Sequence, residues 1–103
     1  AARPQEPYAF GPAAAALMRR ALRRRYRLLP YLYTAFADAH ARGAPVARPV
    51  WLEVPPAEAA GPAAGVEDQF FVGAALLVSP VVEPGARRRT AYFPAGPWFD
   101  LSP

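Results

Sequence analysis

One apolar stripe follows residues 13–42 at the spacing of an α-helix and stops at Gly43. Its members recur at steps of three, four or seven residues: Met18, Leu22, Leu29, Tyr33, Phe36 and His40. This spacing places the side chains on one helical face. We therefore predict a long helical region over 13–42, with Pro12 at a first helical position, where its missing N–H is tolerated, and Gly43 as its C-terminal stop.

Pro30 interrupts this helical region. It removes one backbone donor and its ring clashes with the preceding turn, so we expect a kink or two abutting helices near Leu29. Three further prolines lie in residues 1–12, which favours an extended loop ahead of the helix.

After Gly43 the helical period gives way to short runs of β-prone residues. Three runs are predicted to form strands: 50–54 (VWLEV), 69–82 (QFFVGAALLVSPVV) and 90–93 (TAYF). Between the first two, residues 55–65 are mainly Ala, Pro and Gly, so we expect a surface loop that gives no side chains to a core. Turns are expected at 83–86 and 94–98. The second half is thus predicted to be an incomplete antiparallel sheet, and both chain ends are expected to be cut from a larger protein.

Composition narrows the class of protein. Hydrophobic residues make up 53% of the 103 residues and charged ones 19%, which is too apolar for a disordered polyelectrolyte. The longest apolar run, residues 72–78, is far shorter than the roughly 20 residues that cross a bilayer, and no signal peptide is visible at the N-terminus. Cysteine is absent, so disulfides and thiolate metal sites are excluded within this chain.

A cluster of arginines is the first candidate for a binding site: Arg19, Arg20, Arg23, Arg24, Arg25 and Arg27. They could contact phosphates while Tyr26, Tyr31 and Tyr33 stack on bases, as in a small basic nucleic-acid-binding module. On a helix, however, these arginines spread over a wide arc and leave the apolar stripe clear. The chain also lacks lysine, isoleucine and asparagine, which suggests a G+C-rich coding sequence. We therefore favour a solvated face, and the nucleic-acid module stays the alternative.

The remaining polar residues form no persuasive active site. His40, the one histidine, has Asp38 nearby but no further ligands for a metal. Glu67 and Asp68 are adjacent acids before a predicted strand, which would point them to opposite faces. Glu6 lies in the N-terminal loop, where it could line a cleft or cap a turn. The two serines, Ser79 and Ser102, are not in a nucleophile elbow.

Four segments, in this order, resemble glycoside hydrolase family 31. They are PQEPYAFG (4–11), RYRLLPYLYTAFADAHARGAPVARPVWLEVP (25–55), DQFFVGAALLVSPVVEPGA (68–86) and AYFPAGPWFDL (91–101). The resemblance implies an α/β plus β fold: a fragment of a (β/α)8 TIM barrel, its last helix region, followed by the first strands of an antiparallel β-sandwich. It places residues 1–45 at the C-terminal end of the catalytic barrel and residues 46–103 at the start of the sandwich domain. In the family the segment 55–65 is shorter, so the sheet loop there departs from the pattern.

The same resemblance implies the activity of the parent protein. Family members of this kind are retaining, exo-acting α-glucosidases that release terminal α-linked glucose from oligosaccharides or glycogen-like substrates, using two aspartates on earlier strand ends. The motifs around those aspartates, and a substrate-contacting histidine, lie before residue 1. No catalytic, substrate-binding, cofactor-binding or metal residue is therefore assigned here, no cofactor is implied, and Asp68 and Asp100 match structural positions only. The fragment alone is expected to be inactive. The nearest subgroup is lysosomal, with the secretory pathway as the alternative location.

Overall fold

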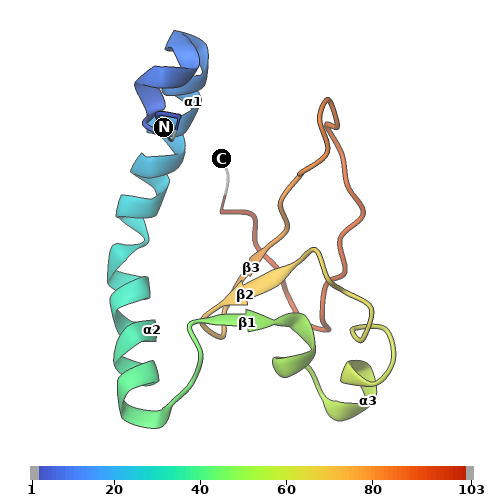
Figure 1. Ribbon diagram of the computed structural model, residues 1–103. Helices are drawn as coiled ribbons and strands as arrows, with labels where there is room; N and C mark the ends of the chain where they lie inside the picture. Colours follow the sequence, from blue (N-terminus) through green and yellow to red (C-terminus); the bar gives the residue numbers. More distant parts are fainter. Residues whose placement is uncertain (1–2, 102–103) are drawn as a thin grey trace. The chain divides into compact units, whose positions relative to one another are not determined.

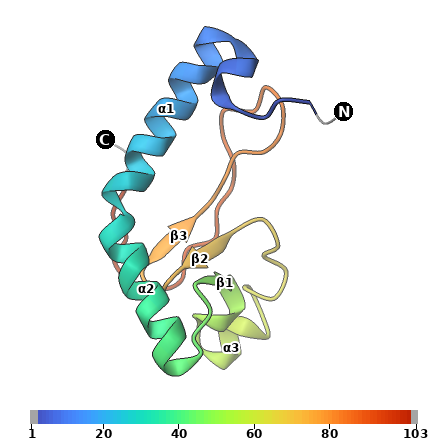
Figure 2. The same cartoon turned by 60° about the vertical axis from the view of Figure 1, so that its left-hand side comes forward.

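The computed structural model describes residues 3–101, and the chain divides after Arg42 into two compact units. The first unit holds a 3₁₀ helix, η1 (Pro7–Phe10), followed by α1 (Gly11–Arg27) and α2 (Leu29–Arg42). Figures 1 and 2 show α1 and α2 as successive lengths of one bent rod. No helix within residues 3–101 is both long and apolar enough to cross a membrane.

The break between the two helices lies at Leu28, which confirms the kink predicted near Leu29. The Leu28 N–H still reaches the carbonyls of Arg24 and Arg25, at 3.2 and 3.0 Å, but Pro30 has no N–H to continue the ladder. Gly43 ends the second helix with φ of 70°, a left-handed conformation that glycine adopts at little cost. The predicted stop is therefore confirmed.

The N-terminal segment differs from the extended loop predicted for residues 1–12. Residues 7–10 form the 3₁₀ turn η1, and the Ala9 N–H donates to the Glu6 carbonyl at 2.9 Å. Proline fixes φ near −65°, a value that suits a 3₁₀ turn as well as an extended chain, so proline content alone predicts the wrong conformation here. Pro12 does lie in the first turn of α1, as expected.

Most of the apolar stripe on α1 and α2 is exposed. The large exposed side chains include Leu22, Tyr26, Leu29, Tyr33 and Phe36, with Tyr33 79% exposed. The helical face predicted from the sequence is present, but within the first unit it has no cover over most of its length. The first unit therefore keeps its helical period without a core of its own.

The second unit contains a three-stranded antiparallel sheet in the order β1-β2-β3 (Figure 1). The strands are β1 (Ala47–Pro49), β2 (Phe70–Val72) and β3 (Leu76–Val78), and Phe71 in the middle strand is paired with Arg48 on one side and Leu77 on the other. The predicted run 69–82 is thus two strands, separated by a turn at Gly73, whose φ is 61°. The predicted turn at 83–86 is confirmed by the Ala86 N–H bond to the Glu83 carbonyl, at 3.1 Å.

The strand predicted over 50–54 is wrong. Residues Val50–Leu52 form a 3₁₀ helix, η2, and the strand lies just before it. Prolines at 49, 55 and 56 remove ladder donors on both sides of this run. The ion pair between Arg48 Nη1 and Glu53 Oε1, at 2.5 Å, closes the turn, because five residues of extended strand would separate these two residues by about 16 Å.

The core of the second unit is small and includes a residue from the predicted surface loop. Val50, Ala63 and Phe71 are buried, with Val54, Val66, Leu77 and Tyr92 packed against them. Ala63 is 0% exposed, so residues 55–65 do contribute to the core, contrary to the prediction. The short helix α3 (Pro56–Ala59) and the turns after it bring this small methyl group into the core.

Residues 90–93, predicted to be a strand, are held instead by side chains. The Gln69 amide binds the Tyr92 backbone at both its oxygen (Tyr92 N–H to Oε1, 2.7 Å) and its nitrogen (Nε2 to the Tyr92 carbonyl, 3.0 Å). Arg89 donates to the carbonyls of Asp68 and Pro80, at 2.9 and 2.8 Å. The Tyr92 N–H and carbonyl are therefore not available for the hydrogen bonds of a strand ladder, because the Gln69 side chain already pairs with both.

Tyr92 also provides a pH-sensitive contact. Its hydroxyl donates to the Glu58 carboxylate, and this bond, with a smaller contribution from burial, raises the pKa of Tyr92 above the ordinary value of 10.0. A raised folded-state pKa stabilises the fold fully below the unfolded pKa, and the stability is lost as pH rises through the folded value. Urea midpoints of the chain should therefore fall more between pH 8 and pH 11 than those of a Tyr92→Phe variant.

The exposed Tyr33 supplies the matched control for this measurement. A Tyr33→Phe variant should follow the unmodified chain across the same pH range, because its hydroxyl has no comparable partner in the structure. Equal pH dependence in the unmodified chain and the Tyr92→Phe variant would contradict the assignment.

Candidate functional site

The residues weighed as catalytic candidates from the sequence form local ion pairs or are exposed within their own units. Asp38 forms an ion pair with Arg42 at 2.7 Å, and Asp68 pairs with Arg89 at 2.8 Å. His40 and Glu6 are exposed, in the first unit. Among residues 3–101 no group of three or more His, Asp or Glu side chains is placed to hold a metal ion.

The arginine cluster lies along α1 with all six side chains exposed. The tyrosines considered as stacking partners differ in exposure: Tyr26 and Tyr33 are exposed and Tyr31 is half-buried. The arrangement is that of a charged helix surface in solvent.

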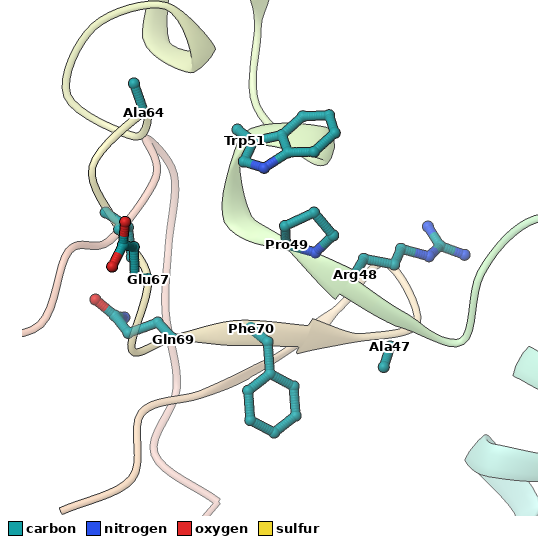
Figure 3. A pocket seen from close by; sticks show the side chains of 9 residues that line it. Ala47, Arg48, Pro49, Trp51, Ala64, Glu67, Gln69 and Phe70 are labelled. Carbon is teal, nitrogen blue, oxygen red and sulfur yellow. The ribbon is translucent and has the colours of Figure 1, made fainter.

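The second unit contains an open hollow. It has a volume of about 540 Å³, within the roughly 300–1,000 Å³ range of small-molecule sites. Its lining residues are Ala47, Arg48, Pro49, Trp51, Ala64, Val66, Glu67, Gln69 and Phe70. Figure 3 shows Trp51 and Pro49 on one side, with Ala64, Glu67 and Gln69 across from them.

Trp51 reaches this hollow because its neighbours fix the turn that carries it. Val50 is fully buried, which anchors η2 to the core and leaves the next side chain facing outward. The Arg48–Glu53 ion pair then closes the turn, with both side chains largely buried at 12% and 18% exposure. Arg48 also donates to the Pro45 carbonyl at 2.6 Å. Trp51 itself is 50% exposed. The turn therefore holds the Trp51 backbone in place while the indole ring stays accessible.

The opposite wall is fixed in the same way. Glu67 follows Val66, which packs on the core, and precedes Asp68, which Arg89 holds through both its carbonyl and its carboxylate. Gln69 is only 4% exposed and its amide nitrogen also donates to Ser79 Oγ at 2.8 Å. The Gln69 amide is therefore occupied by structural bonds, and the free carboxylate of this wall belongs to Glu67.

The chemistry available in the hollow is binding chemistry. Within residues 3–101, the Trp51 indole N–H and the Glu67 carboxylate take part in no hydrogen bond or ion pair, so one donor and one acceptor remain for a ligand beside apolar walls. A single free carboxylate with no nucleophile or metal beside it does not make a hydrolytic site. Sequence patterns did not find this hollow, because Trp51 was placed in a strand and Glu67 was considered only as half of an acid pair.

Comparison with known proteins identifies the class of protein to which this fold belongs. Residues 1–35 match the glycosyl hydrolases family 31 TIM-barrel domain, and residues 43–103 match the glycosyl hydrolase family 31 C-terminal domain. The chain belongs to glycosyl hydrolase family 31, which confirms the resemblance found in the sequence. The barrel match covers α1 and the first half of α2, and the match to the C-terminal domain covers the three-stranded sheet.

Three relatives illustrate the match. The chain is 49% identical over 98 residues to a lysosomal alpha-glucosidase of Mus musculus, 46% identical over 98 residues to alpha-glucosidase 2 of Bacillus thermoamyloliquefaciens, and 50% identical over 90 residues to an alpha-glucosidase of Hordeum vulgare. These alignments cover 95%, 95% and 87% of this chain, but only 10%, 12% and 10% of the relatives. The chain thus spans about a tenth of the length of the curated relatives it matches.

Proposed function

We propose that this chain is a structural part of a retaining, exo-acting α-glucosidase that releases terminal α-linked glucose from oligosaccharides or glycogen-like substrates. The observation that carries the proposal is the match to alpha-glucosidases from a mammal, a bacterium and a plant at 46–50% identity. A retaining mechanism uses one carboxylate as nucleophile and a second as acid/base, about 5–5.5 Å apart. By the proposal, both are supplied outside this chain.

The acidic residues of the chain support the proposal that the catalytic carboxylates are supplied elsewhere. Several of the eight acids in the sequence are engaged in structural contacts, among them Asp38, Glu53, Glu58 and Asp68. Each of these carboxylates already accepts from a cation or a hydroxyl, which stabilises the local fold. Their role is to hold turns and segments together.

The division into domains is proposed on the same basis. Residues 1–45 form the end of the catalytic barrel and residues 46–103 begin a β-sandwich whose second sheet lies outside this chain. The exposed stripe on α1 and α2, including Leu22 and Phe36, supports this, because an uncovered apolar helical face needs a packing partner.

A lysosomal location is proposed from the relative of Mus musculus, a lysosomal alpha-glucosidase. The six exposed arginines of α1 are assigned to a solvated scaffold helix that binds no nucleic acid.

The activity is tested by comparing two polypeptides. The purified 103-residue chain should release no glucose from maltose or 4-nitrophenyl α-glucoside above the buffer control, because it supplies no catalytic carboxyl pair. The whole polypeptide encoded by the gene should hydrolyse both, with α-glucose as the first anomer detected by NMR.

Two outcomes would contradict this account. Glucose release by the 103-residue chain itself would overturn its assignment as a scaffold. An initial β-anomer from the whole polypeptide would overturn the retaining mechanism, and early release of a range of long oligosaccharides from α-glucans would overturn the exo-acting one.

A further inference from the structure

We propose that the hollow beside Trp51 is an accessory binding site for a glucosyl unit of an α-glucan, with the indole face as its platform and the Glu67 carboxylate as its hydrogen-bond acceptor. The site is separate from catalysis, and the choice of an α-linked sugar rests on the proposed function. Such a site would hold the substrate near the enzyme without cleaving it.

The lining matches the chemistry of a sugar ring. A pyranose presents a flat apolar face of C–H groups and a rim of hydroxyls. Trp51 offers a large apolar ring that keeps a polar N–H at its edge, and Pro49 extends the apolar wall beside it (Figure 3). Across the hollow, Glu67 supplies an ionised acceptor, which makes stronger hydrogen bonds than a neutral one. Ligand sites commonly combine apolar walls with a few polar groups in this way.

The hollow is also formed before any ligand arrives. The turn carrying Trp51 is closed by the Arg48–Glu53 pair, and Glu67 lies between a core residue, Val66, and the Arg89-bound Asp68. A site whose walls are already ordered loses less conformational entropy on binding. The two free polar groups are therefore presented from fixed positions.

A cationic ligand is the competing occupant, because an aromatic ring and a carboxylate also suit an ammonium group. Recognition of quaternary ammonium groups relies on a cage of several aromatic faces. Among the lining residues, Trp51 and Phe70 carry aromatic rings, and in Figure 3 the Phe70 ring points away from Trp51, so the two rings form no cage. A single flat platform opposite one acceptor favours a sugar.

The chain itself provides the reporter for a test. It contains two tryptophans, and Trp98 lies outside the hollow, against Phe71 and Phe93. A Trp98→Phe variant therefore makes Trp51 the sole source of indole fluorescence. Titration with maltohexaose should change this emission saturably, whereas cellohexaose, the β-linked isomer, and choline should leave it unchanged.

Matched variants locate the binding groups. Adding Glu67→Ala to the reporter should weaken maltohexaose binding about tenfold or more, since one hydrogen bond to a charged group is lost. Glu83→Ala, in an exposed turn outside the hollow, should change it less than twofold. Trp51→Ala, followed by saturation-transfer NMR on the sugar, should abolish binding. Near-UV circular dichroism of each variant reports whether the core is intact.

The outcomes separate this site from the proposed function. An unchanged Trp51 signal with maltohexaose overturns the site even if the whole polypeptide hydrolyses α-glucosides. A signal that saturates with choline or cellohexaose as well as with maltohexaose overturns the assignment to α-glucans. Saturable, Glu67-dependent binding supports the site even if the whole polypeptide proves to be inactive.

Discussion

Replacing Phe71 with alanine should unfold the second unit of the chain almost completely. Phe71 is 3% exposed at the centre of the middle strand, belongs to the core cluster with Val50 and Ala63, and contacts the Trp98 ring at a centroid distance of 6.1 Å. Removing a buried phenylalanine costs about 3–5 kcal/mol. Proteins have a free energy of unfolding of ~0.05–0.15 kcal/mol per residue, so the total stability of a unit of this size is comparable to that cost. Urea unfolding followed by tryptophan emission would measure the loss.

The neighbouring phenylalanine is the matched control for this prediction. Phe70 is 39% exposed on the other side of the same strand, so Phe70→Ala should cost less than about 1 kcal/mol. If the Phe70 and Phe71 variants lose similar stability, the inward and outward faces of the strand have been assigned incorrectly, because adjacent residues in a strand point to opposite faces.

The second large effect is expected from Gln69→Leu. Leucine has a similar volume but no polar atoms, so the Tyr92 N–H, the Tyr92 carbonyl and the Ser79 hydroxyl would each lose a partner. A buried polar group left unpaired costs about 1–3 kcal/mol, and exposure of residues 90–93 to water limits the total to about 2–4 kcal/mol. Hydrogen exchange should show the Tyr92 amide losing its protection first.

Gln5, the one other glutamine, is the control. It is exposed ahead of η1, and Gln5→Leu should leave the urea midpoint within experimental error. Unchanged protection of the Tyr92 amide in Gln69→Leu would show that the segment is held by other contacts, contrary to the hydrogen bonds described above.

Local signals in the sequence predicted the first unit well. The period of the apolar stripe, Pro30 and Gly43 act within a few residues of their own position, and the structure places the break and the stop where these residues predict them. A helix is stabilised by contacts three and four residues apart, which a single sequence displays directly. No such local signal says what the stripe packs against.

The second unit was harder to predict because its contacts are distant in sequence. The run VWLEV has strand propensity, yet its flanking prolines and the Arg48–Glu53 pair turn it into η2. The TAYF run is fixed by Gln69, 23 residues away, and no local period reveals such a partner. A polar glutamine at the start of an apolar run was the one available signal, since a polar side chain among buried neighbours requires hydrogen-bond partners.

The candidate hollow was missed for a related reason. Its walls come from β1 and η2 and from the segment that leads into β2, which are brought together by the pairing of β1 with β2. Family membership, by contrast, was recognised from ordered strings of residues. Resemblance thus predicted the class of protein, while the contacts of individual side chains needed the structure.

The Arg89 side chain has a consequence for how this domain can vary in length. Its guanidinium donates to the Pro80 carbonyl. Pro80 and Arg89 flank residues 81–88, so this hydrogen bond joins the two ends of that loop. Lengthening a flexible loop whose ends are already fixed costs only about 0.6 kcal/mol per doubling. Insertions can therefore accumulate between Val81 and Arg88 in related proteins while the position of Tyr92 stays constant, and this interval is the natural place to graft a peptide tag.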